Sequence, residues 1–274
     1  MKVALIQLAY GDEEPVADRV DRVAALVRDQ GGHDLVVLPE LWSAGGFDYE
    51  HWAGRAETTE GTTARAMAAA ARAAGVTLHA GSIVETTSDG STGPEGRRLW
   101  NTSLVFAPDG ALQATYRKVH RFGFGAGEPR LMEAGEHLVL TDLPDSAGET
   151  VRAGLSTCYD LRFPELYRAQ LDRGANLFVI PAAWPSARVR HWTLLAHARA
   201  IENQCVVIAC NTAGTHAGHE MGGHSQVVMP TGEALAVAGT GEEVLSVDID
   251  IRAVADWREK FPVLADRRVP DRVR

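Results

Sequence analysis

Cys158 is the residue of this sequence most suited to nucleophilic chemistry. It follows the apolar stretch 151–157, which predicts a buried strand, and it precedes a predicted helix over 163–173. Strand ends that open into a helix carry reactive groups in α/β proteins, and amides at a helix entrance stabilise a thiolate or an oxyanion. The pattern predicts a thiol nucleophile, although most free cysteines are small buried hydrophobic residues. For Cys205 and Cys210, in the run Cys-Val-Val-Ile-Ala-Cys, we expect that core role.

Glu40 and Lys118 are candidate acid–base partners for such a nucleophile. Glu40 follows the apolar stretch 34–38, and a partly desolvated carboxylate suits a general base that takes a thiol proton and returns it to a leaving amine. Lys118 is one of only three lysines among 27 basic residues, and its compact ammonium could neutralise an oxyanion in a way that arginine would do poorly. A structural ion pair for Glu40 and a surface position for Lys118 are the alternative interpretations.

The elements that must position these residues alternate between strands and helices along the chain. Short apolar stretches predict strands, apolar residues at helical spacing predict helices, and glycine or proline marks their ends. Strands are predicted over 2–9, 34–38, 76–84, 103–107, 111–116, 151–157, 176–180, 205–210, 226–229, 233–237 and 244–249, and helices over 14–30, 62–74, 163–173, 191–203 and 251–260. A surface loop is predicted over 85–98, and 117–135 shows no clear periodicity.

Two stretches of the first half have similar counterparts, in the same order, in the second half. They are Asp34-Leu-Val-Val-Leu-Pro39 with Asn176-Leu-Phe-Val-Ile-Pro181, and Ser103-Leu-Val-Phe-Ala-Pro-Asp-Gly110 with Ser225-Gln-Val-Val-Met-Pro-Thr-Gly232. The pairing indicates two related halves, each a sheet with helices on one face, packed sheet to sheet. The counterpart of Glu40 is Ala182, so this charge occurs in one half only and is a modest indication of function.

Composition and charge limit the classes of partner. The 274 residues carry 36 acidic and 27 basic side chains and a formal net charge of -9, which argues against nucleic acid or an anionic membrane as the main partner. No stretch reaches the 18 or more apolar residues of a membrane span. Three cysteines, an odd and sparse set, favour a reduced, cytoplasmic protein. We expect a single domain over residues 1–260, followed by a C-terminal tail over 261–274.

Together, the motifs around the three chemical candidates resemble those of the nitrilase superfamily of carbon–nitrogen hydrolases. They are Leu38-Pro-Glu-Leu-Trp42, Tyr116-Arg-Lys-Val-His120 and Cys158-Tyr-Asp-Leu-Arg-Phe-Pro-Glu165, with further similarity at His191-Trp192, Ala198-Arg-Ala-Ile-Glu-Asn-Gln204 and Gly223-His-Ser225. The resemblance extends from residue 2 to about residue 265. The cysteine motif is similar to that of omega-amidases and deaminated-glutathione amidases, whereas nitrilases proper carry Cys-Trp-Glu. The stretch Phe122-Gly-Phe-Gly125 departs from the omega-amidase pattern.

The resemblance implies a fold and a Glu–Lys–Cys triad. The fold is an α/β, four-layer α-β-β-α sandwich with two mixed sheets, which agrees with the internal duplication. A second glutamate is implied in the loop after the lysine, and Glu128 matches it, with Glu133 and Glu136 as alternatives. The resemblance also implies a homodimer or larger homo-oligomer, formed through the helices of the second half. We expect no metal ion and no organic cofactor.

The expected chemistry is hydrolysis of a small amide to an acid and ammonia through a thioester. Glu40 takes the proton from Cys158, whose sulfur attacks the amide carbonyl, and Lys118 with the backbone N–H of Tyr159 holds the oxyanion. Glu40 then protonates the departing ammonia and activates the water that hydrolyses the thioester, while Glu128 orients Lys118 and the substrate.

The substrate is expected to carry a carboxylate, because the amidases that the cysteine motif resembles cleave such amides. Arg162, Arg188 or Arg190 could bind that group bidentately. Trp184 is a further candidate for substrate contact. The alternative for Arg162 is a structural ion pair with a neighbouring carboxylate, that of Asp160 or that of Glu165.

Other functions remain open from the sequence alone. Within the superfamily these are a nitrilase or an N-carbamoyl hydrolase, and outside catalysis a binding protein on the same fold. A cysteine–histidine enzyme would pair Cys158 with His120 or His197. The loop carrying His216, His219, Glu220 and His224 only loosely resembles a metal site.

Overall fold

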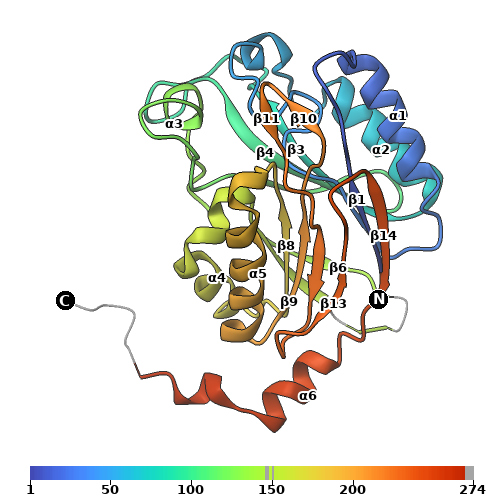
Figure 1. The fold of residues 1–274 in the computed structure, drawn as a ribbon, viewed down its shortest axis with the longest axis vertical. Helices are drawn as coiled ribbons and strands as arrows, with labels where there is room; N and C mark the ends of the chain where they lie inside the picture. The colour runs from blue at the N-terminus through green and yellow to red at the C-terminus, as the bar shows by residue number, and fades with distance from the viewer. Residues whose placement is uncertain (146–147, 150, 269–274) are drawn as a thin grey trace.

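Two six-stranded sheets form the framework of the computed structural model, which describes residues 1–145, 148–149 and 151–268 (Figure 1). The first sheet, in the order β14-β1-β2-β3-β4-β5, contains β1 (Lys2–Gln7), β2 (Leu35–Val37), β3 (Thr77–Glu85), β4 (Trp100–Phe106), β5 (Leu112–Arg117) and β14 (Glu243–Asp248). The second, in the order β13-β12-β9-β8-β7-β6, contains β6 (Leu140–Leu143), β7 (Val151–Leu155), β8 (Leu177–Pro181), β9 (Val206–Cys210), β12 (Gln226–Val228) and β13 (Ala234–Val237).

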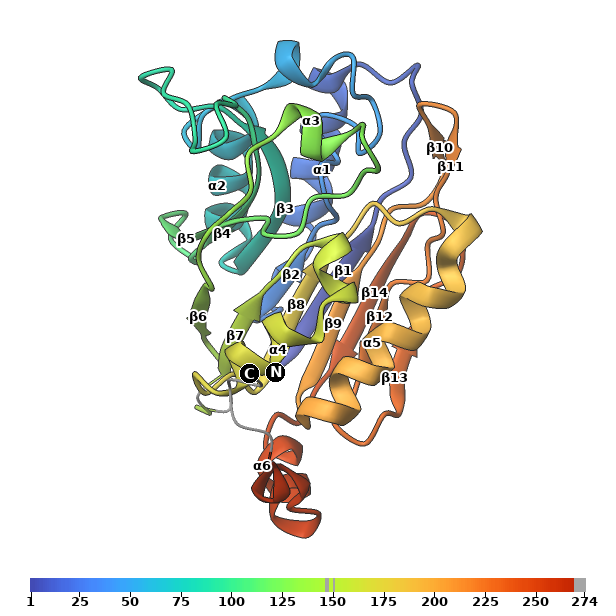
Figure 2. The same ribbon diagram turned by 90° about the vertical axis from the view of Figure 1, so that its left-hand side faces the viewer.

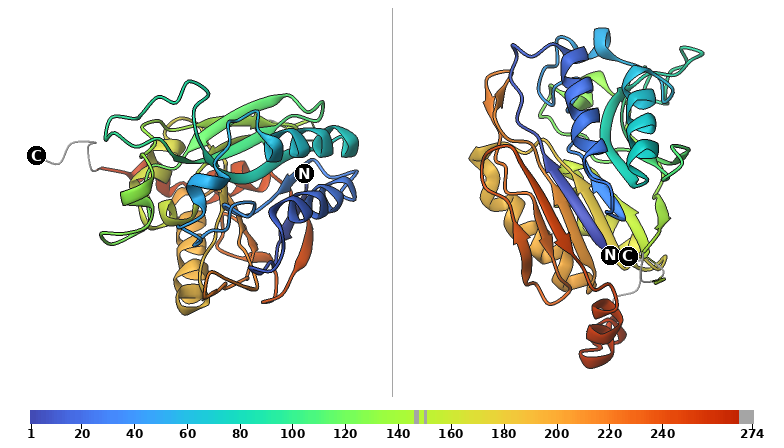
Figure 3. Two further views of the ribbon diagram at one scale, coloured as in Figure 1. Left: turned by 90° about the horizontal axis from the view of Figure 1, so that it is seen from above. Right: turned by 90° about the vertical axis from the view of Figure 1, so that its right-hand side faces the viewer.

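The two sheets pack face to face between two layers of helices (Figures 2 and 3). Helices α1 (Val16–Arg28) and α2 (Thr62–Ala74) cover the first sheet, and α4 (Pro164–Leu171) and α5 (Val189–Asn203) cover the second. The inner faces share one buried cluster, to which Leu5 and Val37 come from the first sheet and Val179 and Ile208 from the second. The predicted four-layer sandwich with two mixed sheets is therefore confirmed.

The two sheets have the same pattern of strand pairing. In the first, β14–β1 is antiparallel, β1–β2–β3 is parallel, and β3–β4–β5 is antiparallel. In the second, β6–β7 is antiparallel, β7–β8–β9 is parallel, and β9–β12–β13 is antiparallel. The similar sequence stretches correspond to β2 with β8 and to the β4–β5 hairpin with the β12–β13 hairpin, so the internal duplication extends to every strand of both sheets.

Helix α2 shows how local sequence sets the outer layers. Its bounds are those that the sequence predicts, and Ala64, Met67 and Ala71 on one face pack against the first sheet. The helix ends where Gly75 adopts a φ of 67°, a left-handed conformation that costs glycine little.

Several short elements are not predicted by the sequence. They are the edge strand β6, the two-residue strands β10 (Thr215–His216) and β11 (His219–Glu220), the helix α3 (Glu128–Leu131), and the 3-10 helices η1 (Trp52–Arg55), η2 (Cys158–Arg162), η3 (Ser186–Arg188) and η4 (Val263–Asp266). Elements of two to five residues are too short for periodicity to be read, and their partners come from distant parts of the chain. The helix predicted over 163–173 is the shorter helix α4, which begins at Pro164 and ends at Leu171.

The C-terminal segment leaves the sandwich after β14. Helix α6 (Ala253–Lys260) projects from the end of the molecule (Figure 1), and the Arg258 guanidinium joins it to the body by donating to the carbonyl oxygens of Gln204 and Ala175 at 3.1 and 3.2 Å. The predicted tail, 261–274, is described only to residue 268. A single domain over 1–260 stays a prediction. No helix in the described residues is long and apolar enough to cross a bilayer.

The shared core between the sheets gives a prediction about stability. Leu5 is completely buried there, so Leu5→Ala should lower the free energy of unfolding by about 2–5 kcal/mol through lost burial and the cavity left behind. Leu112→Ala is the control, because Leu112 is 42% exposed and should cost less than about 0.5 kcal/mol. Chemical denaturation followed by circular dichroism measures both, and equal losses would contradict a core of this kind.

Candidate active site

The candidate catalytic side chains meet where strands from both sheets end. Glu40 lies just after β2 and Lys118 directly after β5, both from the first sheet. Cys158 lies after β7 of the second sheet, and Glu128 begins α3 in the long connection between the sheets. The carboxyl ends of parallel strands are where α/β proteins place reactive groups, and here two such ends face each other. All four side chains are buried.

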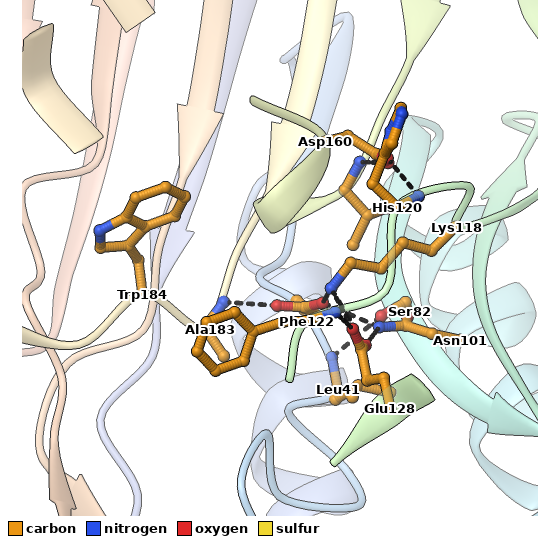
Figure 4. Close-up of polar contacts among 12 residues, drawn as sticks. Leu41, Ser82, Asn101, Lys118, His120, Phe122, Glu128, Asp160, Ala183 and Trp184 are labelled. Atoms are coloured by element: carbon orange, nitrogen blue, oxygen red, sulfur yellow. Dashed lines mark hydrogen bonds and ion pairs between the residues drawn. The ribbon is translucent and has the colours of Figure 1, made fainter. Parts of the chain in front are cut away.

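Lys118 is enclosed by two carboxylates. Its Nζ atom lies 2.7 Å from Glu40 Oε1 and 2.9 Å from Glu128 Oε2 (Figure 4). Burial by itself lowers the pKa of a lysine, but the charges of Glu128 and Glu40 outweigh it and hold the pKa of Lys118 well above its usual range. The side chain is therefore a fixed ammonium, and the surface position considered for it from the sequence is wrong.

Asn101 joins the same group and is not indicated by the sequence motifs. The side-chain amide of Asn101 donates to Glu40 Oε1 at 2.8 Å and to Glu128 Oε1 at 2.7 Å. Its backbone carbonyl oxygen accepts from the Lys118 backbone N–H at 2.8 Å. It lies in β4, which begins three residues before the predicted strand. The only indication in the sequence is that this polar residue stands next to the apolar stretch 103–107, which predicts a buried strand. Asn101 thus helps to keep two carboxylates together around one cation.

Glu40 is held from both halves of the molecule. Its Oε2 accepts from the Ala183 backbone N–H at 2.9 Å, and the neighbouring Leu41 N–H donates to Ser82 Oγ at 3.1 Å. Leu41 has a φ of 46°, an uncommon conformation for a residue with a side chain. The carboxylate therefore contacts the segment beginning at Ala182, its counterpart in the second half, in addition to forming its ion pair with Lys118.

Cys158 occupies a sharp turn beside these groups. It has a φ of 49° and begins η2, so the helix entrance next to it is that of η2 and not that of α4. Burial and the charge of Glu40 raise the pKa of the thiol well above its usual range, while Lys118 opposes them. Of the neighbouring charges, that of Glu40 raises this pKa most. In the resting state it is therefore protonated, with a carboxylate in place to take the proton.

A small pocket opens beside Cys158 and is lined by aromatic rings and two guanidinium groups. Phe122, Tyr159 and Trp184 form its walls. The Arg162 guanidinium carbon lies 4.6 Å from the centre of the Trp184 ring, and that of Arg188 lies 5.3 Å from the Phe122 ring. Among the described residues neither arginine forms an ion pair with a carboxylate, so the structural pair considered for Arg162 is wrong. Two cations lacking a carboxylate partner suit an anionic ligand.

Nearly the whole chain, residues 2–259, matches the carbon-nitrogen hydrolase family. The protein belongs to this family. It is 43% identical over 268 residues to 2-oxoglutaramate amidase of Paenarthrobacter nicotinovorans, with 98% of this chain and 90% of the relative covered. It is 33% identical over 277 residues to omega-amidase NIT2 of Homo sapiens, with 97% and 95% covered. Among solved structures it resembles XC1258 of Xanthomonas campestris, a CN-hydrolase superfamily protein, with a TM-score of 0.87 and 31% identity over 100% of this chain and 99% of that one.

These similarities confirm the predicted family and, at the level of enzyme class, a hydrolase of carbon–nitrogen bonds other than peptide bonds. The three glutamates that the sequence leaves open as candidates lie in different surroundings. Glu128 contacts Lys118, whereas Glu133 accepts from the Glu95 backbone N–H and Glu136 is exposed at a separate cavity. Of the three candidate arginines, Arg190 is exposed and lies outside the pocket lining.

The histidine alternatives find other partners. His120 Nδ1 lies 2.7 Å from Asp160 Oδ1, and His197 Nδ1 lies 2.9 Å from the Gly232 carbonyl oxygen; neither contacts the thiol in the described residues. In the glycine-rich loop, His216 stacks on Tyr10 and the His224 ring contacts the Gly222 carbonyl oxygen. The described residues hold no group of three or more side chains placed to share a metal ion.

Glu128 gives a pH-dependent prediction about stability. Burial, reinforced by Glu40 and opposed by Lys118, raises the pKa of Glu128 above 4.5. A carboxyl group with a higher pKa in the folded state stabilises the fold below the unfolded pKa, and this contribution is lost as the pH rises through the folded pKa. Glu128→Gln removes this pH-dependent contribution, so the Tm of the variant, taken relative to that of the unmodified protein, should be about 2–4 °C higher at pH 8 than at pH 4.

Thermal unfolding between pH 4 and pH 8 tests this. Glu136→Gln is the control, because Glu136 is exposed and the same chemical change there should leave the pH dependence of Tm unaltered. Parallel Tm curves for Glu128→Gln and the unmodified protein would contradict the prediction.

Proposed function

We propose that this protein is an amidase that hydrolyses a small carboxylate-bearing amide to the acid and ammonia through a thioester on Cys158. The observation that carries the proposal is the buried ammonium of Lys118, held between Glu40 and Glu128 near the buried thiol of Cys158. The group joins a nucleophile, a base and a cation, which are the three components that acyl transfer from an amide requires.

In the acylation half-reaction, Glu40 takes the thiol proton as the sulfur of Cys158 bonds to the amide carbonyl carbon. The carbonyl oxygen becomes an oxyanion, which the ammonium of Lys118 and the backbone N–H of Tyr159 stabilise. The Tyr159 N–H suits this role because the first amides of a helix have no partner within the helix. When the carbon–nitrogen bond breaks, Glu40 gives its proton to the leaving nitrogen, ammonia departs, and a thioester remains.

In the deacylation half-reaction, a water molecule replaces ammonia and the same groups act again. Glu40 takes a proton from the water as its oxygen bonds to the thioester carbon, and the oxyanion forms at the same place. The carbon–sulfur bond then breaks, the sulfur regains the proton held by Glu40, and the acid product leaves. Glu128 keeps Lys118 in position throughout, because each of its carboxylate oxygens lies about one hydrogen-bond length from Nζ.

The carboxylate of the substrate is assigned to the two-arginine pocket. Arg162 and Arg188 are both partly buried and face the pocket that contains Cys158. The relatives reported above are named for amidases of 2-oxoglutaramate and of omega-amides, which are short amides with a carboxylate at the far end. We therefore propose an amide of that class as the substrate, with Trp184 and Tyr159 packing against its carbon chain.

A homo-oligomer and a cytoplasmic location belong to the same proposal. Apolar side chains stand exposed on the outer helix of the second half, where Leu194 and Ile201 of α5 are 57% and 53% exposed. Phe261, after α6, is 53% exposed as well. Such side chains favour an interface between copies of the chain through this face. The acidic net charge and the reduced cysteines remain compatible with the cytoplasm.

Cys158→Ala tests the nucleophile. Loss of the thiol should lower ammonia release from omega-amides by about 10⁴-fold or more, because no thioester can form. The circular dichroism spectrum should not change, since the removed atom lies in a pocket wall. Cys205→Ala is the control, because Cys205 lies in the core against the backbone of Ala175 and should retain turnover when folded. Persistent turnover by Cys158→Ala would exclude this mechanism.

Arg162→Met tests the carboxylate site. The substitution keeps much of the side-chain length but removes the charge, so kcat/KM for a carboxylate-bearing omega-amide should fall about 10- to 100-fold. For a neutral aliphatic amide of similar length it should change less than about threefold. Arg190→Met, at an exposed position outside the pocket, is the matched control. Equal losses on both amides would remove Arg162 from substrate recognition.

A further inference from the structure

Asp160 lies at the centre of a buried hydrogen-bond network that the mechanism above does not use. Its side chain is fully buried. Oδ2 accepts from the Tyr116 hydroxyl at 2.7 Å and from the Thr157 backbone N–H at 2.9 Å. Oδ1 accepts from the His120 backbone N–H at 2.9 Å and lies 2.7 Å from His120 Nδ1 (Figure 4). Four contacts on one small side chain make this an unusually constrained carboxylate.

The contacts come from two segments that carry different catalytic groups. Tyr116 and His120 stand two residues before and two residues after Lys118, at the end of β5 in the first sheet. Thr157 immediately precedes Cys158, after β7 in the second sheet. Asp160 thus binds both the segment that bears the ammonium and the segment that bears the thiol. These segments are far apart in the sequence, since Thr157 lies 39 positions after Lys118.

The Thr157 contact also spans the strained turn. The Thr157 backbone N–H donates to the Asp160 carboxylate, and the Asp160 backbone N–H donates back to Thr157. These two hydrogen bonds form a capping box around Cys158. The turn holds Cys158 at a φ of 49°, a conformation that is unfavourable for a non-glycine residue and persists only where surrounding contacts impose it. The carboxylate of Asp160 supplies such a contact on one side and holds the lysine segment on the other.

We propose that Asp160 is a positioning residue, which sets the lysine ammonium against the cysteine thiol by accepting one backbone N–H from each of their segments. The inference rests on the proposed function for its meaning in turnover, but the geometry that it invokes is independent of the substrate. The ring of His120, stacked on Phe163 with centres 3.8 Å apart, completes the network and keeps the lysine segment against η2.

Asp160→Asn is the decisive variant. Each carboxylate oxygen now accepts one backbone N–H, and a backbone N–H cannot turn or change tautomer to become an acceptor. The amide of asparagine offers one acceptor and one donor, so one of the two backbone contacts must break whichever way the side chain is oriented. We expect kcat to fall about 10²-fold with KM changed less than about threefold, since positioning is felt mainly in the transition state.

A second readout does not depend on any amide substrate. Of the charged groups that act on the Cys158 thiol, Glu40 and Glu128 disfavour the thiolate, whereas Lys118 and, from the pocket, Arg162 favour it. If Asp160→Asn moves the ammonium away, alkylation of Cys158 by iodoacetamide, followed by mass spectrometry of its peptide, should become about tenfold slower at each pH between 6 and 9. A role in stability alone predicts the opposite, because a loosened fold exposes the buried thiol and alkylates faster.

Three further variants complete the experiment. Asp172→Asn is the matched control, since Asp172 forms an exposed ion pair with Arg267 and should change neither readout. Asp160→Glu keeps two acceptor oxygens and should recover part of the alkylation rate. Tyr116→Phe keeps both backbone contacts of Asp160, so kcat should fall less than about fivefold. If Asp160→Asn does not fold, Tyr116→Phe becomes the test. A 10²-fold loss of kcat in Tyr116→Phe would then overturn the proposal.

The outcomes separate the two proposals. Alkylation of Asp160→Asn that is unchanged or faster would overturn the positioning role even if amide turnover is established. Slower alkylation in a protein that hydrolyses no amide would support the positioning role and refute the proposed function.

Discussion

A single buried ammonium sets the constraints on the rest of the structure. Lys118 lies out of reach of water between Glu40 and Glu128, and taking three charged groups out of water is costly unless each is closely paired. The pairing needs groups from β2, β4, β5 and α3 to arrive within hydrogen-bond distance of one point. Those elements therefore have little freedom to shift, and the site inherits its rigidity from the need to keep this charge compensated.

The duplicated framework carries chemistry that is not duplicated. Both sheets have the same pairing pattern, and both have a proline where the corresponding strand ends: Pro39 lies two residues after β2, and Pro181 is the last residue of β8. In the first half the next residue is a carboxylate, whereas in the second it is Ala182, followed by a backbone N–H that binds that carboxylate. The thiol comes instead from the strand β7, one position across in the second sheet. Two equivalent turns thus have different roles: one carries the carboxylate, and the other supplies the backbone N–H that binds it.

The sequence predicts the large elements and the chemical residues, because both depend on local features. Apolar periodicity and glycine or proline stops give α2 with its observed bounds, and the motifs around Glu40, Lys118 and Cys158 give three side chains that meet in the structure. Residues whose role arises from contacts across the two sheets are harder to predict. Asn101 is a polar residue beside an apolar stretch, and its carboxylate partners Glu40 and Glu128 come from the segment after β2 and from α3. Asp160 lies inside the cysteine motif, and its partner Tyr116 comes from β5 of the other sheet. The membership of β14 in the first sheet has the same cause, since its partner β1 lies at the opposite end of the sequence.

That last pairing has a consequence for how the chain folds. β1, which precedes the other strands of the two sheets in the sequence, pairs on one side with β2 and on the other with β14, whose register runs from Lys2 opposite Asp248 to Gln7 opposite Glu243. Until β14 has paired with β1, the backbone groups on that side of β1 stay unpaired and form an open edge of the first sheet. Contacts with this sequence separation slow folding and delay the closing of the sheet until nearly all of the chain is available. We expect this pairing to link the folding of the two similar halves, so that the active site at their junction forms late, after β1 and β14 have paired.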